Sequence, residues 1–331
     1  MKNKSDKNKR ITDVLSGIQE HVVMRDFTSF HIGGVADYFY KAETVDKLIQ
    51  AVRTAVELRI PYFILGNGSN ILFSDYGLAG LVIKNATSNI SIMKEKSQVI
   101  VDSGVMLPRL IMELASNDLA GLEFLYGVPG TIGGALYGNA GAWGNAIGDF
   151  VKNITVLEKD PETGIPKVNQ YDASWLDFSY RDSKLKKMKA KEKPVILTAR
   201  LQLARSQKEE IIRRLNVAQE KRQKSQPIGL SVGSIFRNPY PQELQNITGT
   251  GTKNMPEFPR ERTAGYMLDQ AGVKKLKVGS AEVSNVHANF IVNKNGARAT
   301  EIRSLIEGMR DKVKDKFDVT LEEEIEYIGQ W

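Results

Sequence analysis

The sequence contains no cysteine, which excludes disulfide bonds, zinc thiolate sites and cysteine nucleophiles. Its three histidines, His21, His31 and His287, form no spaced cluster, so we expect no metal site. No apolar run approaches the roughly 18 residues that a membrane-spanning helix needs. The first ten residues, MKNKSDKNKR, lack the apolar region of a signal peptide. These absences predict a cytoplasmic protein that does not insert into a membrane.

The chain also lacks the common nucleotide-binding motifs. Its turn at residues 66–70, GNGSN, is not followed by the Gly-Lys-Ser/Thr of a Walker A loop. An apolar strand rather than a helix comes after it, which argues against a dinucleotide site of Rossmann type. Glycine permits positive φ, and Asn and Ser add side-chain partners to exposed backbone N–H groups. Two interpretations of this turn remain open, a ligand-binding turn and an ordinary hairpin turn.

Positive charge is in excess, with a formal net charge of +7 over 331 residues. The first ten residues hold five Lys or Arg against one Asp, and residues 184–193 hold six lysines. Basic patches can bind nucleic acid, but neither run has interleaved aromatic residues, and such runs are more typical of solvated surface. A moderate positive field would also suit a phosphate-bearing substrate.

Glycine is concentrated in one stretch, Gly121 to Gly144, which holds eight of the 28 glycines. Leu, Ile, Val and Phe are interleaved with these glycines, so the stretch is not of low complexity. A packed segment with so few side chains lets another group approach its backbone closely. That group is either a ligand pyrophosphate held by main-chain N–H groups or a second stretch of backbone. The local pattern favours neither.

The hydrophobic pattern predicts an α+β protein without internal repeats. Amphipathic helices are expected at 44–59, 107–115 and 300–317, and a long polar helix with a thin apolar side at 206–223, with short strands between them. Pro227 marks a domain boundary, and residues 240–260 are expected to form a surface loop. The last predicted strand, residues 319–328, alternates apolar residues with glutamates.

Three polar residues are candidates for chemistry. Arg181 follows apolar residues, and a buried Arg needs a carboxylate, a phosphate or a developing oxyanion beside it; a salt-bridged surface Arg is the alternative. Ser234 could deliver a proton in a dry pocket, or it could be an ordinary turn serine. Glu324 lies on the acidic face of the last strand, which either faces solvent or lines a cleft.

Seven motifs occur in the order typical of one bacterial family: TSFHIGG at 28–34, LGNGSNIL at 65–72, GVPGTIGGALYGNAGAWG at 127–144, YRDS at 180–183, GSIFRNP at 233–239, HANFIVN at 287–293 and LEEEIEYIG at 321–329. In these motifs, over about residues 22–330, the chain resembles the UDP-N-acetylenolpyruvoylglucosamine reductases. The family is also called UDP-N-acetylmuramate dehydrogenase and belongs to peptidoglycan synthesis, and hence to cell wall biogenesis, cell shape and cell division.

The resemblance implies an α+β fold with a two-lobed FAD-binding region of the vanillyl-alcohol-oxidase type and a smaller substrate-binding α+β domain. We expect a disordered basic tail at 1–20, followed by FAD-binding lobes at 21–86 and 87–226. The substrate-binding domain would span 227–317. The C-terminal strand, 318–331, would return to the second FAD-binding lobe.

The resemblance also implies the ligands and the residues that bind them. FAD would be the cofactor, NADPH the co-substrate and UDP-N-acetylglucosamine enolpyruvate the substrate. The residues expected to bind FAD are Gly66, Asn67, Gly68, Ser69, Asn70, Gly130, Thr131, Gly133, Gly134, Asn139 and Gly141. The residues expected to bind substrate are Trp143, Asn238, Lys274 and Asn289.

In the reaction that the resemblance implies, NADPH delivers hydride to flavin N5, and the enolpyruvyl ether then takes it at its terminal vinyl carbon. Arg181 and Glu324 would polarise the enolpyruvyl carboxylate and stabilise the enolate, and Ser234 would protonate the adjacent carbon. Glu324 would have to carry a proton to donate a hydrogen bond.

The chain departs from the family pattern at two points. Some relatives have an extra Tyr-bearing loop over the UDP group, whereas residues 184–193 here are rich in lysine, so the chain resembles the shorter subclass. His31 stands where many relatives have Arg, which leaves its role unassigned. Two other functions remain as alternatives: a different flavin oxidase of the same fold, and a nucleotide- or RNA-binding protein that uses the basic runs.

Overall fold

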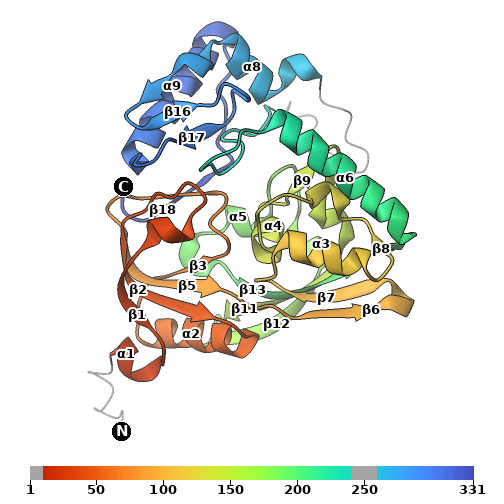
Figure 1. Cartoon of the computed structure of the whole chain (residues 1–331). Coiled ribbons are helices and arrows are strands. Elements are labelled where there is room, and N and C mark those ends of the chain that lie inside the picture. The colour runs from red at the N-terminus through yellow and green to blue at the C-terminus, as the bar shows by residue number, and fades with distance from the viewer. Residues whose placement is uncertain (1–9, 240–258) are drawn as a thin grey trace.

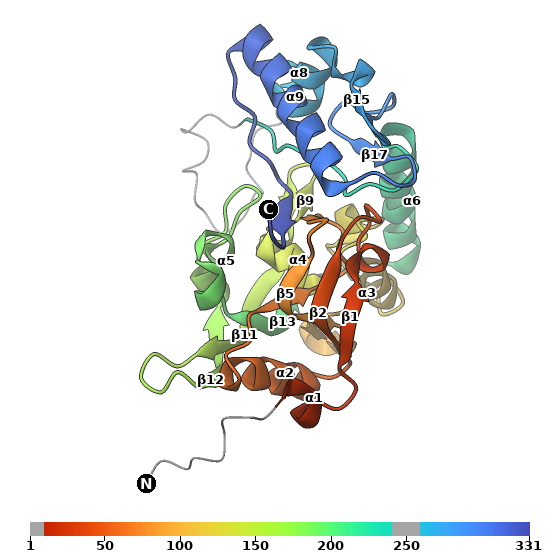
Figure 2. The ribbon, with the colours of Figure 1, turned by 90° about the vertical axis from the view of Figure 1, so that its left-hand side faces the viewer.

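The computed structural model describes residues 10–239 and 259–331. The chain from 259 to 317 lies above the rest of the molecule, and residues 10–226 form the larger lower part (Figures 1 and 2). Most of the expected surface loop at 240–260 therefore falls outside the described residues. Helices and strands mix in both parts, as an α+β protein requires.

The first unit of the lower part is a four-stranded sheet covered on one face by a helix. Its strand order is β1 (Gln19–Val23), β2 (Val35–Ala42), β5 (Leu78–Asn85) and β3 (Tyr62–Leu65). Strand β5 runs parallel to both β2 and β3. Helix α2 (Val45–Glu57) begins where Thr44 accepts a hydrogen bond from the N–H of Lys47 at 3.2 Å. Its buried side chains, including Leu48 and Val52, pack on the sheet.

The second unit of the lower part is a five-stranded antiparallel sheet. Its order is β12 (Pro166–Asp172), β11 (Val151–Lys159), β13 (Val195–Gln202), β7 (Gln98–Asp102) and β6 (Ile90–Met93). Helices α3 (Leu107–Ala115) and α4 (Ile132–Tyr137) lie between this sheet and the upper part (Figure 1). Helix α6 (Lys208–Ser225) packs Ile211 and Leu215 against the same core.

The lower part also contains shorter elements outside the two large sheets. They are β8 (Leu119–Ala120) with β14 (Ala204–Arg205), β9 (Gly141–Ala142) with β10 (Asn145–Ala146), and α5 (Lys184–Lys187). The helix α6 begins two residues later than 206, and Gln207 at its start makes no side-chain cap.

The upper part has a small sheet of β15 (Lys277–Val278), β16 (Ala281–Val283) and β17 (Ile291–Asn293), packed with α8 (Ala264–Gln270) and α9 (Ala299–Phe317). Its contacts with the lower part include two hydrogen bonds to loops next to the four-stranded sheet. Asp75 accepts a hydrogen bond from the N–H of Ala299 at 2.8 Å, which caps α9 from the other part. Asn293 donates to the carbonyl oxygen of Phe30 at 2.8 Å.

The last strand, β18 (Glu326–Ile328), pairs in parallel with β4 (Ile71–Phe73). Strand β4 lies within residues 21–86, so the expected return of 318–331 to the lobe at 87–226 is wrong for the strand itself. The strand is also shorter than the predicted 319–328. Only residues 326–328 have a neighbouring strand long enough to form a ladder, and Glu323 makes an isolated bridge to Phe236.

The expected disorder of residues 1–20 is wrong for residues 10–20. Helix α1 (Ile11–Val14) buries Ile11, and Leu15 after it is also buried. Both pack with α2 in one hydrophobic cluster, because two apolar side chains suffice to fix a short segment on an existing core. Residues 1–9 lie outside the described part of the chain.

Candidate active site

The two glycine-rich turns that the sequence singles out lie against each other. Asn67 Nδ2 donates a hydrogen bond to the carbonyl oxygen of Pro129 at 2.8 Å. Gly66 faces Thr131 so closely that a Cβ on Gly66 would lie 2.8 Å from Thr131 Oγ1. Thr131 caps α4 by accepting from the N–H of Gly134 at 3.3 Å. The turns therefore form one surface with exposed backbone and the start of a helix beside it.

Glycine is required at one position of the first turn for a visible reason. Gly68 has φ +64°, and a Cβ there would lie 2.2 Å from the carbonyl oxygen of Phe27. Its own carbonyl oxygen accepts from the N–H of Ser29 at 3.0 Å. This contact places the motif at 28–34 beside the turn. Ser69, also in the turn, lies close to Gly130, whose added Cβ would be 4.0 Å from Ser69 Oγ.

Lys84, on β5, brings positive charge to the first turn. Its ammonium group donates a hydrogen bond to the carbonyl oxygen of Gly66, and burial, followed by the charge of Lys41, lowers the pKa of Lys84. Among the described residues no carboxylate lies within ion-pair distance of it. A half-buried cation without a carboxylate, next to exposed backbone in two touching turns, fits the anionic pyrophosphate of a dinucleotide cofactor.

The later residues of the glycine-rich stretch form hydrogen bonds with other segments of the lower part. Gly133 donates its N–H to the carbonyl oxygen of Ser103 at 2.7 Å. Asn139 is buried, accepts from the N–H of Gly148 at 3.1 Å and donates to the carbonyl oxygen of Ser179 at 2.9 Å. Gly141 lies in β9 against β10. The side chain of Asn139 is thus used to place the segment that leads to Arg181.

Arg181 and Glu324, 143 residues apart in the sequence, meet at the junction of the upper and lower parts. Arg181 Nε lies 3.3 Å from Glu324 Oε1, and each side chain is 23% exposed. The N–H of Arg181 Nε has no hydrogen-bond partner in the described part of the chain, so the two groups are close but not aligned as a hydrogen bond. Burial acts to lower the pKa of Arg181, but Glu324 and Tyr180 raise it overall, and the guanidinium stays charged.

Ser234 is connected to this pair by a backbone hydrogen bond between its neighbour Ile235 and Glu324. It follows Gly233, which has φ +86°, and it forms an isolated bridge with Phe290. The next residue, Ile235, accepts a hydrogen bond from the N–H of Glu324 at 2.8 Å. The Ser234 hydroxyl has no hydrogen bond to any described residue, which leaves it available to a ligand.

The four glutamates of the run at 322–326 neither form an unpaired acidic face nor line one cleft together. Each of these glutamates contacts a different cation: Arg237 binds Glu322, Arg310 binds Glu323, Arg181 binds Glu324 and Lys186 binds Glu326. Parity in the sequence could not reveal these partners, because three of the four cations lie in segments far from the run.

The four residues expected to bind substrate differ in their exposure and in their partners within the protein. Trp143 is 47% exposed, and Lys221 and Arg222 each lie 5.1 Å from its ring centroid. Lys274 pairs with Asp269 at 2.9 Å. The remaining two use their side-chain amides within the protein: Asn238 accepts from the N–H of Ala264 at 3.0 Å, and Asn289 binds the backbone of Phe236.

Sequence reasoning missed several residues at the junction. Tyr180 hydrogen-bonds the backbone of Asn238 and interacts with Arg181. Lys186, inside the lysine run that was interpreted as solvated surface, has a side chain only 20% exposed and contacts Glu326 at 3.4 Å. Nothing in a run of six lysines distinguishes the one that turns inward, although the apolar Leu185 beside it is buried.

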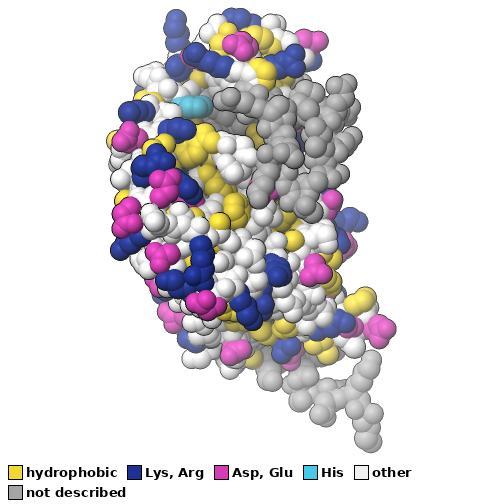
Figure 3. Space-filling model, turned by 90° about the vertical axis from the view of Figure 1, so that its right-hand side faces the viewer, with side chains coloured by type: hydrophobic (Ala, Val, Ile, Leu, Met, Phe, Trp, Pro, Cys, Tyr) yellow, Lys and Arg dark blue, Asp and Glu magenta, His cyan; other side chains and the backbone are white. Residues whose placement is uncertain are grey.

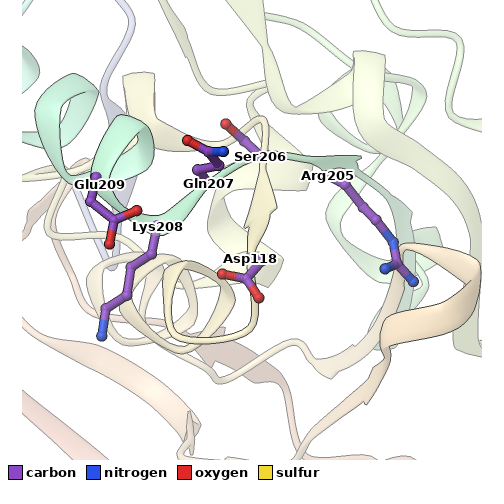
Figure 4. A pocket seen from close by; sticks show the side chains of 6 residues that line it. All are labelled: Asp118, Arg205, Ser206, Gln207, Lys208 and Glu209. Atoms are coloured by element: carbon purple, nitrogen blue, oxygen red, sulfur yellow. The ribbon is translucent and has the colours of Figure 1, made fainter.

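A separate depression of about 780 Å³ lies at the first turn of α6 (Figure 4). It is lined by Asp118, Arg205, Ser206, Gln207, Lys208 and Glu209. Two of its charged side chains have partners in the lower part: Asp118 pairs with Lys94 at 2.8 Å, and Arg205 pairs with Glu95 at 3.2 Å. At 1.5 Å per residue, roughly 20 Å of helix separates it from the end of α6 near Trp143, so it is not part of the candidate site.

The face of the molecule in Figure 3 has Lys and Arg side chains interspersed with Asp and Glu and beside a strip of hydrophobic residues. On α6, Glu210 pairs with both Arg213 and Arg214. On this face, the described Lys and Arg side chains are thus mixed with acidic ones, whereas nucleic acid binding uses a clustered basic patch. Within residues 10–239 and 259–331, no cluster of His, Asp or Glu could hold a metal ion, and no helix is long and apolar enough to cross a membrane.

Comparisons with known proteins bear on the same segments. Residues 36–163, which include both glycine-rich turns, match the FAD-binding domain, and residues 224–328 match the C-terminal domain of UDP-N-acetylenolpyruvoylglucosamine reductase. The reductase of that name from Caldicellulosiruptor saccharolyticus is 37% identical over 312 residues, covering 93% of this chain and 91% of its own. The one from Clostridium novyi is 33% identical over 328 residues, covering 98% and 97%. The chain belongs to the UDP-N-acetylenolpyruvoylglucosamine reductase family.

A solved structure of the family has the same fold. The reductase from Thermus caldophilus superposes with a TM-score of 0.73 at 31% identity, covering 94% of this chain and 99% of its own. The predicted fold class, an FAD-binding region followed by a smaller α+β domain, is thereby confirmed. The chain is an FAD-dependent oxidoreductase of peptidoglycan synthesis, as the sequence motifs indicated.

Proposed function

We propose that this chain reduces the enolpyruvyl ether of UDP-N-acetylglucosamine to UDP-N-acetylmuramate, with FAD as cofactor and NADPH as co-substrate. The approach of Arg181 to Glu324, with the backbone of Glu324 bonded next to Ser234, is the observation that carries the proposal. A permanent cation thus lies beside a carboxyl group, and the backbone of that glutamate is bonded to the residue after Ser234. This supports the proposal because a carboxylate-bearing alkene needs charge stabilisation and a proton donor.

FAD, when bound, supplies hydride transfer from NADPH to the terminal vinyl carbon of the substrate. The residues of the turns at 66–70 and 130–141 hold it: Gly66, Asn67, Gly68, Ser69, Asn70, Gly130, Thr131, Gly133, Gly134, Asn139 and Gly141. Exposed backbone N–H groups and Lys84 offset the charge of its pyrophosphate. Asn139 contributes through the segment that it positions, because its amide is bonded within the protein.

Arg181 binds the substrate carboxylate through the guanidinium N–H that has no hydrogen-bond partner among the described residues. As hydride arrives at the vinyl carbon, negative charge grows on the carboxylate side of the alkene. The positive charge of Arg181 and a hydrogen bond from the Glu324 carboxyl group stabilise this enolate. The Ser234 hydroxyl donates its proton to the carbon that bears the ether oxygen, which gives the lactyl ether.

The surrounding residues place the substrate. Trp143 and the two cations beside it, Lys221 and Arg222, offer an aromatic face and positive charge at the junction. Lys274 adds a further cation on the upper part. Asn289 supports the segment 234–239, because both ends of its amide are bonded to the backbone of Phe236. Asn238 uses its Oδ1 to hold the N–H of Ala264 and offers its Nδ2 to substrate. We also propose that the enzyme works in the cytoplasm, where nucleotide-linked sugars and NADPH are made.

Anaerobic half-reactions test the proposal. NADPH should bleach the flavin absorbance of the purified holoprotein, and UDP-N-acetylglucosamine enolpyruvate added next should restore it in the absence of oxygen. If only oxygen restores the absorbance, the chain is an oxidase of the same fold instead. If the purified protein is colourless and cannot be reconstituted with FAD, the cofactor assignment is wrong.

A further inference from the structure

The backbone N–H and carbonyl groups of Glu324 bind three separate segments. Its N–H donates to Ile235, next to Ser234, at 2.8 Å. Its carbonyl oxygen accepts from Asn70 Nδ2 at 3.0 Å and, at a longer 3.5 Å, from Lys186 Nζ. The direction of the Glu324 carboxyl group is therefore set where the turn at 66–70, the Ser234 segment and α5 meet.

Lys186 makes a second contact with the same strand. Its ammonium group lies 3.4 Å from Glu326 Oε1, and its side chain is 20% exposed. Arg181 and Lys186 come from one segment and bind Glu324 and Glu326, which are two residues apart where the chain enters β18. The neighbouring Lys187 differs: it is 50% exposed and pairs with Asp177 at 3.1 Å.

Glu326 also binds Tyr137, the last residue of α4. The Tyr137 hydroxyl hydrogen-bonds Glu326 and accepts from Lys193 Nζ at 2.6 Å. Burial, followed by the charge of Glu326, raises the pKa of Tyr137, so its hydroxyl keeps its proton and can donate it to the carboxylate. Helix α4 begins at the second glycine-rich turn. The hydrogen bond from Tyr137 therefore links this helix with the first residue of β18, two residues after Glu324.

We propose that Lys186 is a positioning residue for Glu324. By holding both the Glu326 carboxylate and the Glu324 carbonyl oxygen, it fixes the strand against α5 and keeps the Glu324 carboxyl group beside Arg181. A displacement of such a group by about 1 Å can cost on the order of a hundredfold in rate. The inference rests on the proposed function, since Glu324 matters for the half-reaction with the enolpyruvyl substrate and not for reduction by NADPH.

The test compares holoprotein variants in the two half-reactions. Lys186→Met should leave the rate of flavin reduction by NADPH within about twofold and slow reoxidation by UDP-N-acetylglucosamine enolpyruvate about ten- to a hundredfold. Lys186→Arg, which keeps the charge, should recover most of that loss, and Lys187→Met should behave as the unmodified protein. Glu326→Gln combined with Lys186→Met should be no slower than either alone, because the two residues act as a unit.

A measurement without substrate separates this inference from the proposed function. In the FAD-loaded protein, Lys186→Met should speed amide hydrogen exchange of the peptide that contains Glu324 and Glu326 about fivefold or more, whereas Lys187→Met should not. Unchanged exchange there would overturn the positioning role, and so would equal slowing of both half-reactions. If the unmodified holoprotein itself is not reoxidised by the substrate, the proposed function fails, while the exchange result still decides the role of Lys186.

Discussion

Asn289 binds the backbone of Phe236 on both sides: its Oδ1 accepts from the N–H of Phe236 at 2.9 Å, and its Nδ2 donates to the carbonyl oxygen at 2.8 Å. The side-chain amide thus replaces a missing strand, and it fixes the short extended segment that begins at Ser234. A segment with only isolated bridges would otherwise leave buried backbone groups unpaired. The segment that begins at Ser234 is therefore held by the side chain of Asn289 and by isolated bridges rather than by a sheet.

Ser234→Ala should separate the two half-reactions. Flavin reduction by NADPH should stay unchanged, because the hydroxyl takes no part in it, and reoxidation by the enolpyruvyl substrate should fall roughly a hundred- to ten-thousandfold. Stopped-flow absorbance of the flavin measures both steps. Reoxidation at the normal rate would remove Ser234 from the proton-donor role.

Glu324→Gln should keep more activity than Glu324→Ala. The amide can still donate a hydrogen bond to the enolate, whereas alanine removes the donor and also leaves Arg181 without its partner. We expect about tenfold loss of reoxidation rate for Gln and about a hundred- to a thousandfold for Ala. Equal losses in the two variants would show that hydrogen-bond donation is not the task of Glu324.

Lys84→Met should weaken FAD binding about tenfold, or by about 1.4 kcal/mol, because it removes the cation at the first glycine-rich turn. Fluorescence titration of the apoprotein with FAD measures the Kd. Lys41→Met is the matched control: Lys41 lies beside Lys84 on β2, is 60% exposed and pairs with Glu43 at 3.0 Å. Equal affinities in all three proteins would remove Lys84 from the cofactor site.

Stability should fall on acidification through His287. Burial, followed by the charge of Lys274, lowers the pKa of His287, and its Nδ1 accepts from the N–H of Asn289 at 3.2 Å. Above the ordinary histidine pKa of about 6.5, His287 is neutral in both states, and its contribution is intact. Below that value the unfolded chain takes up the proton first, so the free energy of unfolding decreases until the pH passes the folded pKa.

His287→Asn keeps an acceptor near the position of Nδ1 and does not titrate. Urea unfolding at about pH 7.5 and about pH 5.5 should show a smaller loss of stability for this variant than for the unmodified protein. His21, which is exposed, provides the control, and His21→Asn should keep the full difference. An identical pH dependence in His287→Asn would rule out this contribution.

The candidate residues of the site could be named from sequence because they lie in short motifs. The local patterns alone left a ligand-binding turn and an ordinary turn open, and the resemblance to a family, carried by seven motifs in order, assigned FAD to the glycine-rich turns and chemical roles to Arg181, Ser234 and Glu324. The residues that hold these groups were not predictable in this way. Lys186, Tyr137 and Lys84 are of common types, and their importance depends on partners far away in the sequence.

The errors in the predicted fold have the same origin. The N-terminal segment and the last strand have their local patterns, but neither pattern says what they pack against. Residues 10–15 are ordered because α2 offers a core, and residues 326–328 pair with β4 because the turn at 66–70 brings an open strand edge there. Tertiary pairing of this kind is a property of the folded chain rather than of a window of sequence.

The hydrogen bond between Asn70 and Glu324 spans 254 residues. At the usual pace of synthesis, about 5 to 20 residues per second, the ribosome adds Glu324 roughly 10 to 50 s after Asn70. During that time the turn at 66–70 and the glycine-rich stretch at 121–144 can both be made, but Glu324 does not yet exist. On the proposed function, a newly made chain therefore has its cofactor-binding turns before it has the carboxyl group that acts on the sugar nucleotide.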